Sequence, residues 1–426
     1  MTSIAEHGKA VHIVFSSIPA WGRVRPFCIL AARLVNMNKN MIITLFLSSN
    51  LLQKAKNEIL AEFQGKEPAN IFERIRVLAS FNSDSNDLHT IFVPLVKTYA
   101  TTYEALTQSQ PVTCTVTGTK FDPVPPPNIV ILDVSAYAHL QATRSITGHA
   151  VPIVSWVTGH ASSAIRLFGP ADRGGHGDLG ARSAEWALQT GASLEDIGDS
   201  TKGTVVRIPG VPPMYDWEFF PQDVCAAKLP YGFTLKWSLE FDECDAVLTT
   251  SAFVVEKEPI EGLRSWFSEW KKEFEVRDTS LKCTESKDFL DKALAEYGER
   301  SVMLISFGMI FWPTRQEYIE EVLEVLIEKE FPFIIYLNTA PLATLSNNLI
   351  EKIKMSCLGL VPKRINQQEI LNHPAAGWFL THGGHNSVTE SLRSGIPLQV
   401  PYQDLLTQIQ LLTCIALHQD MLANGS

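Results

Sequence analysis

The stretch of sequence that decides the fold reads INQQEILNHPAAGWFLTHGGHNSVTESLRSGIPLQVP and covers residues 365–401. Its apolar run at 377–380 predicts a buried strand. Residues 388–393 predict a helix, and Gly395 stands where a C-cap glycine belongs. A strand, a tight turn and a helix in this order form one step of a parallel α/β sheet.

The turn between this strand and this helix has the composition of an anion site. Residues 382–384, His-Gly-Gly, predict a tight turn at which bare backbone approaches a ligand closely. Asn386 and Ser387 are good N-cap residues just ahead of the helix, whose N–H groups and partial positive charge attract phosphate without a lysine or a metal. Glu390, about one turn further on, can accept hydrogen bonds from ribose hydroxyls. An ordinary strand–loop–helix joint with a capping serine is the alternative.

Similar α/β steps extend along the rest of the chain. Towards the C-terminus, strands are predicted at 301–307, 333–337 and 358–362, and helices at 314–329 and 367–372. Nearer the N-terminus, strands are predicted at 11–18, 40–47, 128–132, 151–157 and 246–250, and helices at 27–35 and 136–147. A proline- and glycine-rich turn is predicted over 19–26, and a long polar loop over 168–203.

The two α/β series predict two Rossmann-like parallel-sheet lobes that face each other across a cleft. We expect an N-terminal lobe at 1–255, a charged connection at 256–299 and a C-terminal lobe at 300–426. Ligands of such sheets bind at the carboxyl ends of the strands. From the pattern alone, a two-domain α/β protein of unrelated chemistry is an equal alternative.

Composition excludes several classes of protein. The chain has 426 residues, which is too long for one ordinary core, and 45% of them are hydrophobic, which excludes disorder over most of the chain. Its net charge is −10 and no run of Lys or Arg stands out, which argues against a protein devoted to duplex nucleic acid. No stretch of about 18 apolar residues predicts a transmembrane segment.

The cysteines indicate the compartment. There are seven, scattered without a C-x-x-C pair, which is typical of reduced thiols rather than of a disulfide framework or a zinc site. The N-terminal segment lacks the features of a secretory signal. We therefore expect a cytoplasmic protein.

The stretch at 365–401 resembles the signature of the family 1 UDP-dependent glycosyltransferases, whose pattern is (P)Q-x-x-I-L-x-H-x-x-x-G-x-F-x-T-H-x-G-x-N-S-x-x-E-x-x-x-x-G-[IV]-P. The residues that match it are Gln367, Ile370, Leu371, His373, Gly377, Phe379, Thr381, His382, Gly384, Asn386, Ser387, Glu390, Gly395, Ile396 and Pro397. The resemblance extends to 301–308 with 311–313 in the first C-terminal strand, to 19–26 in the N-terminal loop and to 130–133 in the strand of the catalytic Asp.

The resemblance implies the GT-B fold and a hexosyltransferase, with an acceptor-binding N-terminal lobe at 1–255 and a nucleotide-sugar-binding C-terminal lobe at 300–426. Such an enzyme moves a sugar from a UDP-sugar to a hydroxyl of a small lipophilic acceptor with inversion, and it needs no cofactor and no metal, since the UDP-sugar is a substrate. The residues that the resemblance assigns to the nucleotide are Gln367 at the uracil, Glu390 at the ribose, and His382, Gly384, Asn386 and Ser387 at the diphosphate.

The same resemblance implies a histidine as general base, oriented by an Asp. Asp133 matches that Asp, but Arg23 stands at the position of the histidine. An arginine stays protonated and offers no acceptor, so it cannot take a proton. An ion pair between Arg23 and Asp133 is the alternative reading of this site.

Further departures affect the donor site. Met309 replaces a serine, and Arg364 replaces the aromatic residue that opens the signature. Of the pair that holds the donor sugar, Asp404 fits with a one-residue gap, whereas Leu405 replaces the glutamine. The chain also ends earlier than the family pattern, which predicts an incomplete C-terminal lobe.

Other candidate residues have simpler explanations. His382 and His385 are three residues apart with His373 nearby, which suggests a metal site. Such a site needs three or four converging ligands, however, and these two histidines flank glycines in a loop, so we expect no metal. His139 and His160 are possible substitute bases, although each is more often a structural polar residue. Residues 216–218, Asp-Trp-Glu, suit the acceptor region or a solvated loop.

Three functions follow, of unequal weight. The first is an active UDP-glycosyltransferase of impaired activity, with an acidic phenol or a thiol as a suitable acceptor. The second is a non-catalytic relative that binds a nucleotide or another small ligand and has lost the general base. A nicotinamide-dependent oxidoreductase is disfavoured, because no G-x-G-x-x-G follows either first strand.

Overall fold

The structure is a computed structural model that describes residues 10–63, 70–82, 88–175, 188–189, 191, 203–219, 240–251, 253, 255–269, 273–276, 286–308, 312–313, 316–337, 344–362 and 365–399. The chain divides into two units. The first comprises residues 1–158, 233–250 and 263–279, and the second comprises 159–232, 251–262 and 280–426.

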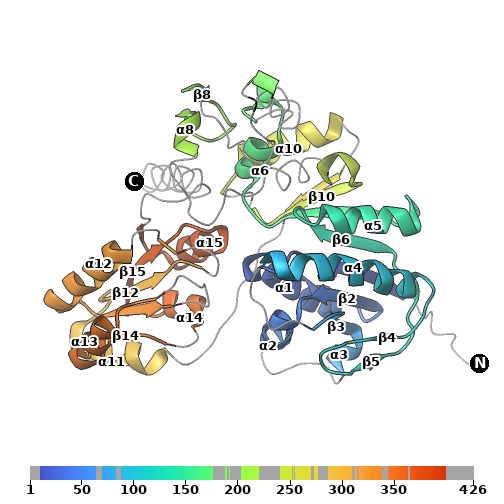
Figure 1. The fold of residues 1–426 in the computed structure, drawn as a ribbon. Coiled ribbons are helices and arrows are strands. Elements are labelled where there is room, and N and C mark those ends of the chain that lie inside the picture. The colour runs from blue at the N-terminus through green and yellow to red at the C-terminus, as the bar shows by residue number, and fades with distance from the viewer. Residues whose placement is uncertain are drawn as a thin grey trace, which may run out of the picture. The chain divides into compact units, whose positions relative to one another are not determined.

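The first unit is built on a seven-stranded parallel sheet (Figure 1). Across the sheet, the strands are β11 (Glu273–Val276), β10 (Ala246–Thr249), β7 (Ile153–Val157), β6 (Ile129–Asp133), β1 (Val11–Ser16), β2 (Met41–Leu47) and β3 (Ile75–Ala79). The chain winds from β1 to β3 on one side and from β6 to β11 on the other, so its winding reverses between β1 and β6. Ligands of such sheets bind at the carboxyl ends of the strands beside this reversal.

Aromatic side chains hold helices to both faces of this sheet. Phe27 packs its ring 5.4 Å from that of Phe15 and 4.5 Å from that of Trp156. Tyr99 packs 5.0 Å from Phe46, which lies on the opposite face, because Phe46 pairs with the residue after Phe15. The helices of this unit are α1 (Trp21–Met37), α2 (Leu52–Glu62), α3 (Ile71–Arg74), α4 (Leu88–Thr107) and α5 (Tyr137–Thr147), with a 3₁₀ turn η1 (Ser49–Leu51) and a small hairpin of β4 (Val112–Thr113) and β5 (Lys120–Phe121).

The second unit holds a five-stranded parallel sheet. Its strands, in order across the sheet, are β14 (Gly359–Leu360), β13 (Phe333–Tyr336), β12 (Val302–Ser306), β15 (Ala376–Thr381) and β16 (Leu398–Gln399). The winding reverses between β12 and β15, so this sheet also has a binding edge at the carboxyl ends of two central strands. The helices that accompany it are α11 (Lys287–Tyr297), α12 (Gln316–Glu328), α13 (Asn347–Ser356), α14 (Gln367–Leu371) and α15 (His385–Ser394).

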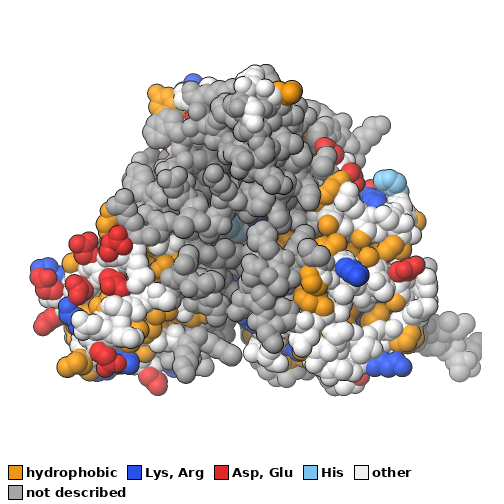
Figure 2. Space-filling model, viewed as in Figure 1, with side chains coloured by type: hydrophobic (Ala, Val, Ile, Leu, Met, Phe, Trp, Pro, Cys, Tyr) orange, Lys and Arg blue, Asp and Glu red, His pale blue; other side chains and the backbone are white. Residues whose placement is uncertain are grey.

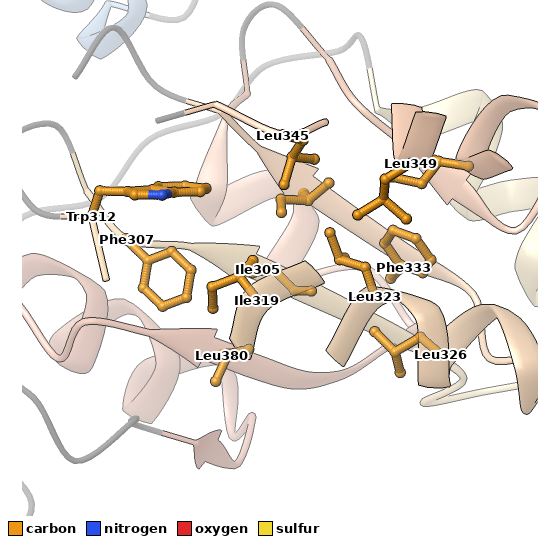
Figure 3. Packing of buried hydrophobic residues seen from close by; sticks show 12 residues of the cluster. Ile305, Phe307, Trp312, Ile319, Leu323, Leu326, Phe333, Leu345, Leu349 and Leu380 are labelled. Carbon is orange, nitrogen blue, oxygen red and sulfur yellow. The ribbon is translucent and has the colours of Figure 1, made fainter. Parts of the chain in front are cut away.

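Successive residues of each strand point to opposite faces of this sheet and pack into two separate hydrophobic cores. Ile305 of β12 and Phe333 of β13 pack against residues of α12 and α13, among them Leu323 of α12 (Figure 3). Leu304 and Ile334, the neighbours of those strand residues, pack instead with α11 and α14. The period of two in the strand sequences therefore distributes four helices over two faces.

The remaining elements of the second unit are short. They are α6 (Ala161–Phe168), a 3₁₀ turn η2 (Ala171–Arg173), a small hairpin of β8 (Val205–Val206) and β9 (Met214–Tyr215), and α8 (Asp216–Phe219). Helix α10 (Lys257–Glu269) contributes residues to both units. Within the described part of the chain, no helix has an apolar stretch long enough to cross a membrane.

The predicted fold class is confirmed, since both sheets are parallel and wound as Rossmann-like sheets. The turn predicted over 19–26 is wrong from Trp21 onward, because α1 begins there. Val24 and Phe27 are fully buried on this helix, and their burial offsets the unfavourable Pro26 within it. Residues 273–276, within the predicted connection, form the edge strand β11 of the first sheet.

Charged side chains of both signs are interspersed on the outer face of α12 and α13 (Figure 2). Lys352 of α13 donates to Glu324 of α12 at 3.1 Å, and both side chains are about half exposed. Such exposed pairs contribute at most about 1 kcal/mol, so apolar packing rather than charge holds these helices.

Leu323→Ala should test that packing. Leu323 is fully buried in the cluster of Figure 3, and its truncation should lower the free energy of unfolding by about 2–5 kcal/mol in denaturant titrations. Val325→Ala, on the same helix at a half-exposed position, is the control and should change it by less than about 0.5 kcal/mol. Equal losses for the two variants would contradict the assignment of this core.

Candidate functional site

Two glycines bring the backbone close to His382 at the centre of the second unit's sheet. His382 directly follows β15, and Gly308 follows the neighbouring strand β12. A Cβ atom on Gly308, whose φ is +72°, would lie 2.6 Å from Cε1 of His382, and a Cβ atom on Gly384 would overlap its Nε2. The imidazole fits between the two turns because neither glycine has a side chain.

His382 carries a neutral imidazole at physiological pH. Burial lowers its pKa to about 4, because the charged form loses hydration. The Oγ1 atom of Thr381 lies 3.4 Å from its Nδ1. A neutral imidazole donates from one nitrogen and accepts at the other, so this ring can hydrogen-bond a phosphate without adding a charge.

The helix after this turn begins earlier than the sequence predicts. Helix α15 starts at His385, with Gly384 as its N-cap and no side chain capping its first turn. The prediction that Asn386 and Ser387 stand just ahead of the helix is wrong, because both lie within its first turn. Their backbone N–H groups thus belong to the set that no helical carbonyl reaches, which attracts anions.

An amide–carboxylate cluster joins α14 to α15 beside this turn. Gln367 donates its Nε2 to Oγ of Ser387 at 3.2 Å and to Oε2 of Glu390 at 2.8 Å. Gln368 donates to the other oxygen of Glu390 at 3.1 Å. Asn366 caps α14 by accepting from the backbone N–H groups of the second and third residues after it, which fixes both glutamines. Gln367 therefore joins two other predicted nucleotide residues, Ser387 and Glu390.

His373 holds the turn before β15. Its Nδ1 accepts from the backbone N–H of Ala375 at 3.2 Å, so the proton sits on Nε2, which donates to Asp291 at 3.1 Å. Both ring nitrogens are used, which makes His373 a structural residue. No group of three metal-ligating side chains occurs among the residues that the structure describes.

In the first unit, Arg23 and Asp133 lie together where the winding reverses. Asp133 ends β6 and is fully buried, and Nη1 of Arg23, in the first turn of α1, lies 3.6 Å from its Oδ2. The same Nη1 donates to Oγ1 of Thr158 at 2.9 Å, and this hydroxyl donates to Oδ2 of Asp133 at 3.3 Å. The backbone N–H of Ser135 donates to Oδ1 at 2.9 Å.

This arrangement is the ion pair that the sequence left as an alternative. The guanidinium of Arg23 occupies the place beside Asp133 that the family resemblance gives to an imidazole. Because it has only donors and stays protonated, it can hold an anion but cannot accept a proton.

The two other histidines named from the sequence have different surroundings. His139 is fully buried on α5, its ring 4.6 Å from that of Tyr99, and burial lowers its pKa to about 3. It is a residue of the core. His160 lies at the N-cap position of α6, and its ring packs edge-to-face against His385, with 4.5 Å between the centroids.

The carboxylate of Glu256 accepts several hydrogen bonds beside His160. Its carboxylate lies 3.0 Å from Nδ1 of His160 and accepts from the backbone N–H groups of Ala161 at 2.9 Å and Ser162 at 3.0 Å. The hydroxyls of Ser162 and Ser251 donate to it as well. Burial alone would raise the pKa of Glu256, but the imidazole and these hydrogen bonds hold it well below its usual value.

Asp216 stabilises the small hairpin rather than facing solvent. It is buried and accepts from the backbone N–H of Gly203 at 2.9 Å and from the hydroxyl of Thr204 at 2.8 Å. Glu218 accepts from the backbone N–H of Tyr215 at 2.6 Å. These bonds give both carboxylates a local structural role.

Some of the predicted residues lie outside the described part of the chain. They are Met309, Arg364, Asp404, Leu405, the side chain of Trp217 and most of the loop at 168–203.

Sequence reasoning missed Thr158 and Glu256. Thr158 follows the strand β7, and a polar residue at the carboxyl end of a strand was the signal that would have found it. Glu256 carries no such signal, because it meets His160 across 96 residues of sequence.

Known sequences similar to this chain include glycosyltransferases. The pattern of the family described as UDP-glucoronosyl and UDP-glucosyl transferase matches residues 273–403. The UDP-glycosyltransferase eriJ of Hericium erinaceus is 25% identical over 413 residues, which cover 91% of this chain and 78% of that protein. The anthocyanidin 3-O-glucosyltransferase of Solanum melongena is 28% identical over 48% of this chain and 47% of its own length.

Solved structures agree on the fold. Phytolacca americana UGT2, complexed with UDP-2fluoro-glucose and pterostilbene, superimposes with a TM-score of 0.66 at 18% identity, covering 97% of this chain and 84% of that one. Medicago truncatula UGT71G1, complexed with UDP-glucose, gives a TM-score of 0.63 at 16% identity over 95% of this chain and 83% of that one.

Arg23→Met should destabilise the first unit by about 3 kcal/mol, because it leaves the buried charge of Asp133 without its cation. Adding Asp133→Asn should recover part of the loss, which gives a coupling of about 1–3 kcal/mol in a double-mutant cycle measured by denaturant unfolding. Arg33→Met breaks a more exposed pair with Glu62 and should cost about 1 kcal/mol or less. Additive effects of the Arg23 and Asp133 substitutions would refute the ion pair.

Proposed function

This chain belongs to the UDP-dependent glycosyltransferase family, and we propose that it transfers a hexose from a UDP-sugar to a hydroxyl of a small lipophilic acceptor with inversion. The observation that carries the proposal is the position of the His382 ring, which lies between Gly308 and Gly384 just before the first turn of α15. It combines a neutral hydrogen-bonding ring, close backbone and the N-terminus of a helix at one place. This combination suits a diphosphate, since each part stabilises negative charge without a metal.

The cluster beside this turn suits a nucleoside. We assign the diphosphate to His382, Gly384, Asn386 and Ser387, the ribose to Glu390 and the uracil to Gln367. A carboxylate has about four acceptor positions, so the two amides that Glu390 accepts leave capacity for ribose hydroxyls. Asp404 is assigned to the donor sugar on the family pattern alone.

The departing UDP carries the charge that this site has to stabilise. As the bond between the sugar and the β-phosphate breaks, its electron pair goes to a phosphate oxygen. The first turn of α15 offers N–H groups and a positive dipole end to that oxygen, a role that metal ions play in other enzymes. We therefore propose that the reaction needs no cofactor.

The ion pair at Asp133 favours a second candidate function. Arg23 fills the position of the family's base, which suits a relative that binds a nucleotide or a small ligand without turnover. An acidic phenol or a thiol is the acceptor that suits the first candidate best, because it loses its proton with little help.

UDP binding and UDP release together distinguish these functions. Calorimetry with UDP should detect binding, and incubation of UDP-glucose and other UDP-hexoses with simple phenols should release UDP and give a hexosylated phenol by mass spectrometry. Binding without release would favour the non-catalytic relative. Absence of both would refute the assignment of the nucleotide site.

Gly384→Ala should weaken UDP binding by about tenfold, because the new methyl group displaces the imidazole of His382 and its hydrogen bond to phosphate. Gly395→Ala is the control at the far end of the same helix, where a methyl group has open space and cannot reach His382. Because the φ of Gly395 is +63°, this variant loses about 1 kcal/mol of stability, which thermal unfolding reports separately from binding. The control should keep the dissociation constant of UDP, measured by calorimetry, within about twofold. An unchanged constant for Gly384→Ala would contradict the site.

We also propose a cytoplasmic location, on the pattern of the cysteines. Those of known placement, Cys28, Cys114, Cys244 and Cys357, carry free thiols. Titration of the denatured protein with a thiol reagent, without prior reduction, should therefore count seven thiols. A lower count would indicate disulfides and an oxidising compartment.

A further inference from the structure

We propose that His160, oriented by Glu256, is the catalytic base of this protein, in place of the imidazole whose position Arg23 occupies. The inference rests on the sugar transfer proposed above, because it names the residue that takes the acceptor's proton. His160 would be the catalytic residue and Glu256 a positioning residue.

A carboxylate-held imidazole is the arrangement that a general base needs. Nδ1 of His160 lies 3.0 Å from Oε2 of Glu256, and a carboxylate offers acceptors only, so the ring carries its proton on this nitrogen and donates it to Glu256. The tautomer is thereby fixed, and the lone pair lies on Nε2. Glu256 is itself held by four further hydrogen bonds, from two backbone N–H groups and two hydroxyls.

Nε2 of His160 is a buried polar atom with no hydrogen-bond partner in the described part of the chain. Leaving such an atom unpaired costs about 1–3 kcal/mol, so a hydroxyl that donates to it would recover this energy. The acceptor's hydroxyl supplies that donor. Ring and ligand would then form the chain of carboxylate, imidazole and hydroxyl that activates a nucleophile.

Five other histidines whose side chains are described do not combine these features. Those of His12 and His373 use both ring nitrogens, His12 with Pro125 and Thr44. His139 is a core residue that burial keeps neutral, and the pKa of His382 is lowered to about 4 beside the predicted phosphate site. His149 is exposed on the surface.

His160 also lies near the donor site. Its ring contacts that of His385, the first residue of α15, and both belong to the second unit. Asn386 and Ser387, the next residues of that helix, are those assigned to the diphosphate. In the sequence, His160 comes two residues after Thr158, whose hydroxyl donates a hydrogen bond to Asp133.

The proposed step balances as follows. Nε2 of His160 takes the proton of the acceptor hydroxyl while the acceptor oxygen forms a bond to the anomeric carbon of the sugar. The bond from that carbon to the β-phosphate oxygen breaks, and its electron pair leaves with UDP. The imidazolium, stabilised by the Glu256 carboxylate and facing the ring of His385, then loses its proton to solvent.

His160→Asn tests the assignment with little disturbance of the fold. The Asn amide can still donate to Glu256 from a place close to that of Nδ1, and Asn is a favoured N-cap residue for α6. We expect kcat/KM with unsubstituted phenol to fall about 10²–10⁴-fold. With 4-nitrophenol, which loses its proton far more easily, the loss should be much smaller.

Further readouts separate a base from a structural residue. The acidic limb of the kcat/KM pH profile should disappear in His160→Asn, and Glu256→Gln should change that profile and lower kcat, with partial recovery in Glu256→Asp. His149→Asn, at an exposed histidine, should behave as the parent. Should His160→Asn fail to fold in thermal unfolding, His160→Gln replaces it in the same assays.

The outcomes are decisive in each direction. The dissociation constant of UDP should stay within about twofold in His160→Asn, which shows that the donor site is intact. Unchanged kcat/KM and pH profile in this variant, or equal losses with both phenols, would overturn the role of His160 and leave the sugar transfer standing. A parent protein that binds UDP but releases none from UDP-hexoses would overturn both.

Discussion

The contact of the His382 ring with bare backbone is the constraint on which the C-terminal structure depends. Gly308 and Gly384 lie at the ends of neighbouring turns, and a side chain on either would collide with the imidazole. The ring is brought there because β12 and β15 are adjacent and parallel, so that both turns leave the same edge of the sheet. Position and chemistry therefore have one cause, the reversal of winding between these two strands.

Two buried carboxylates, Asp133 and Glu256, have partners of different chemistry. Asp133 is neutralised by Arg23, a permanent cation, and this pair has no means of accepting a proton. Glu256 accepts hydrogen bonds from its neighbours and contacts the imidazole of His160, a ring whose neutral form has a lone pair. The difference in partner, guanidinium against imidazole, is what makes the second arrangement a candidate for proton transfer and the first a structural pair.

The sequence predicted the order of strands and helices well where the apolar pattern was clean. The strands β1, β6 and β12 and the helix α5 agree with the predicted ranges within two residues. Predictions failed where burial outweighed local preference, as in α1, which continues through Gly22 and Pro26. Helix α15 begins at His385 because Gly384 is its N-cap, although Asn386 and Ser387 are better caps by intrinsic preference.

The sequence by itself showed the resemblance to the UDP-dependent glycosyltransferases and the presence of Arg23 where that resemblance expects a base, and it predicted the nucleotide residues. These inferences depend on residue type and spacing within short stretches. Only the tertiary structure decided that Arg23 pairs with Asp133 through Thr158, and that Glu256 holds His160. Arg23 and Thr158 are 135 positions apart in the sequence, and His160 and Glu256 are 96 positions apart. Local periodicity carries no information about such distant pairs, since the packing of sheets and helices alone brings them together.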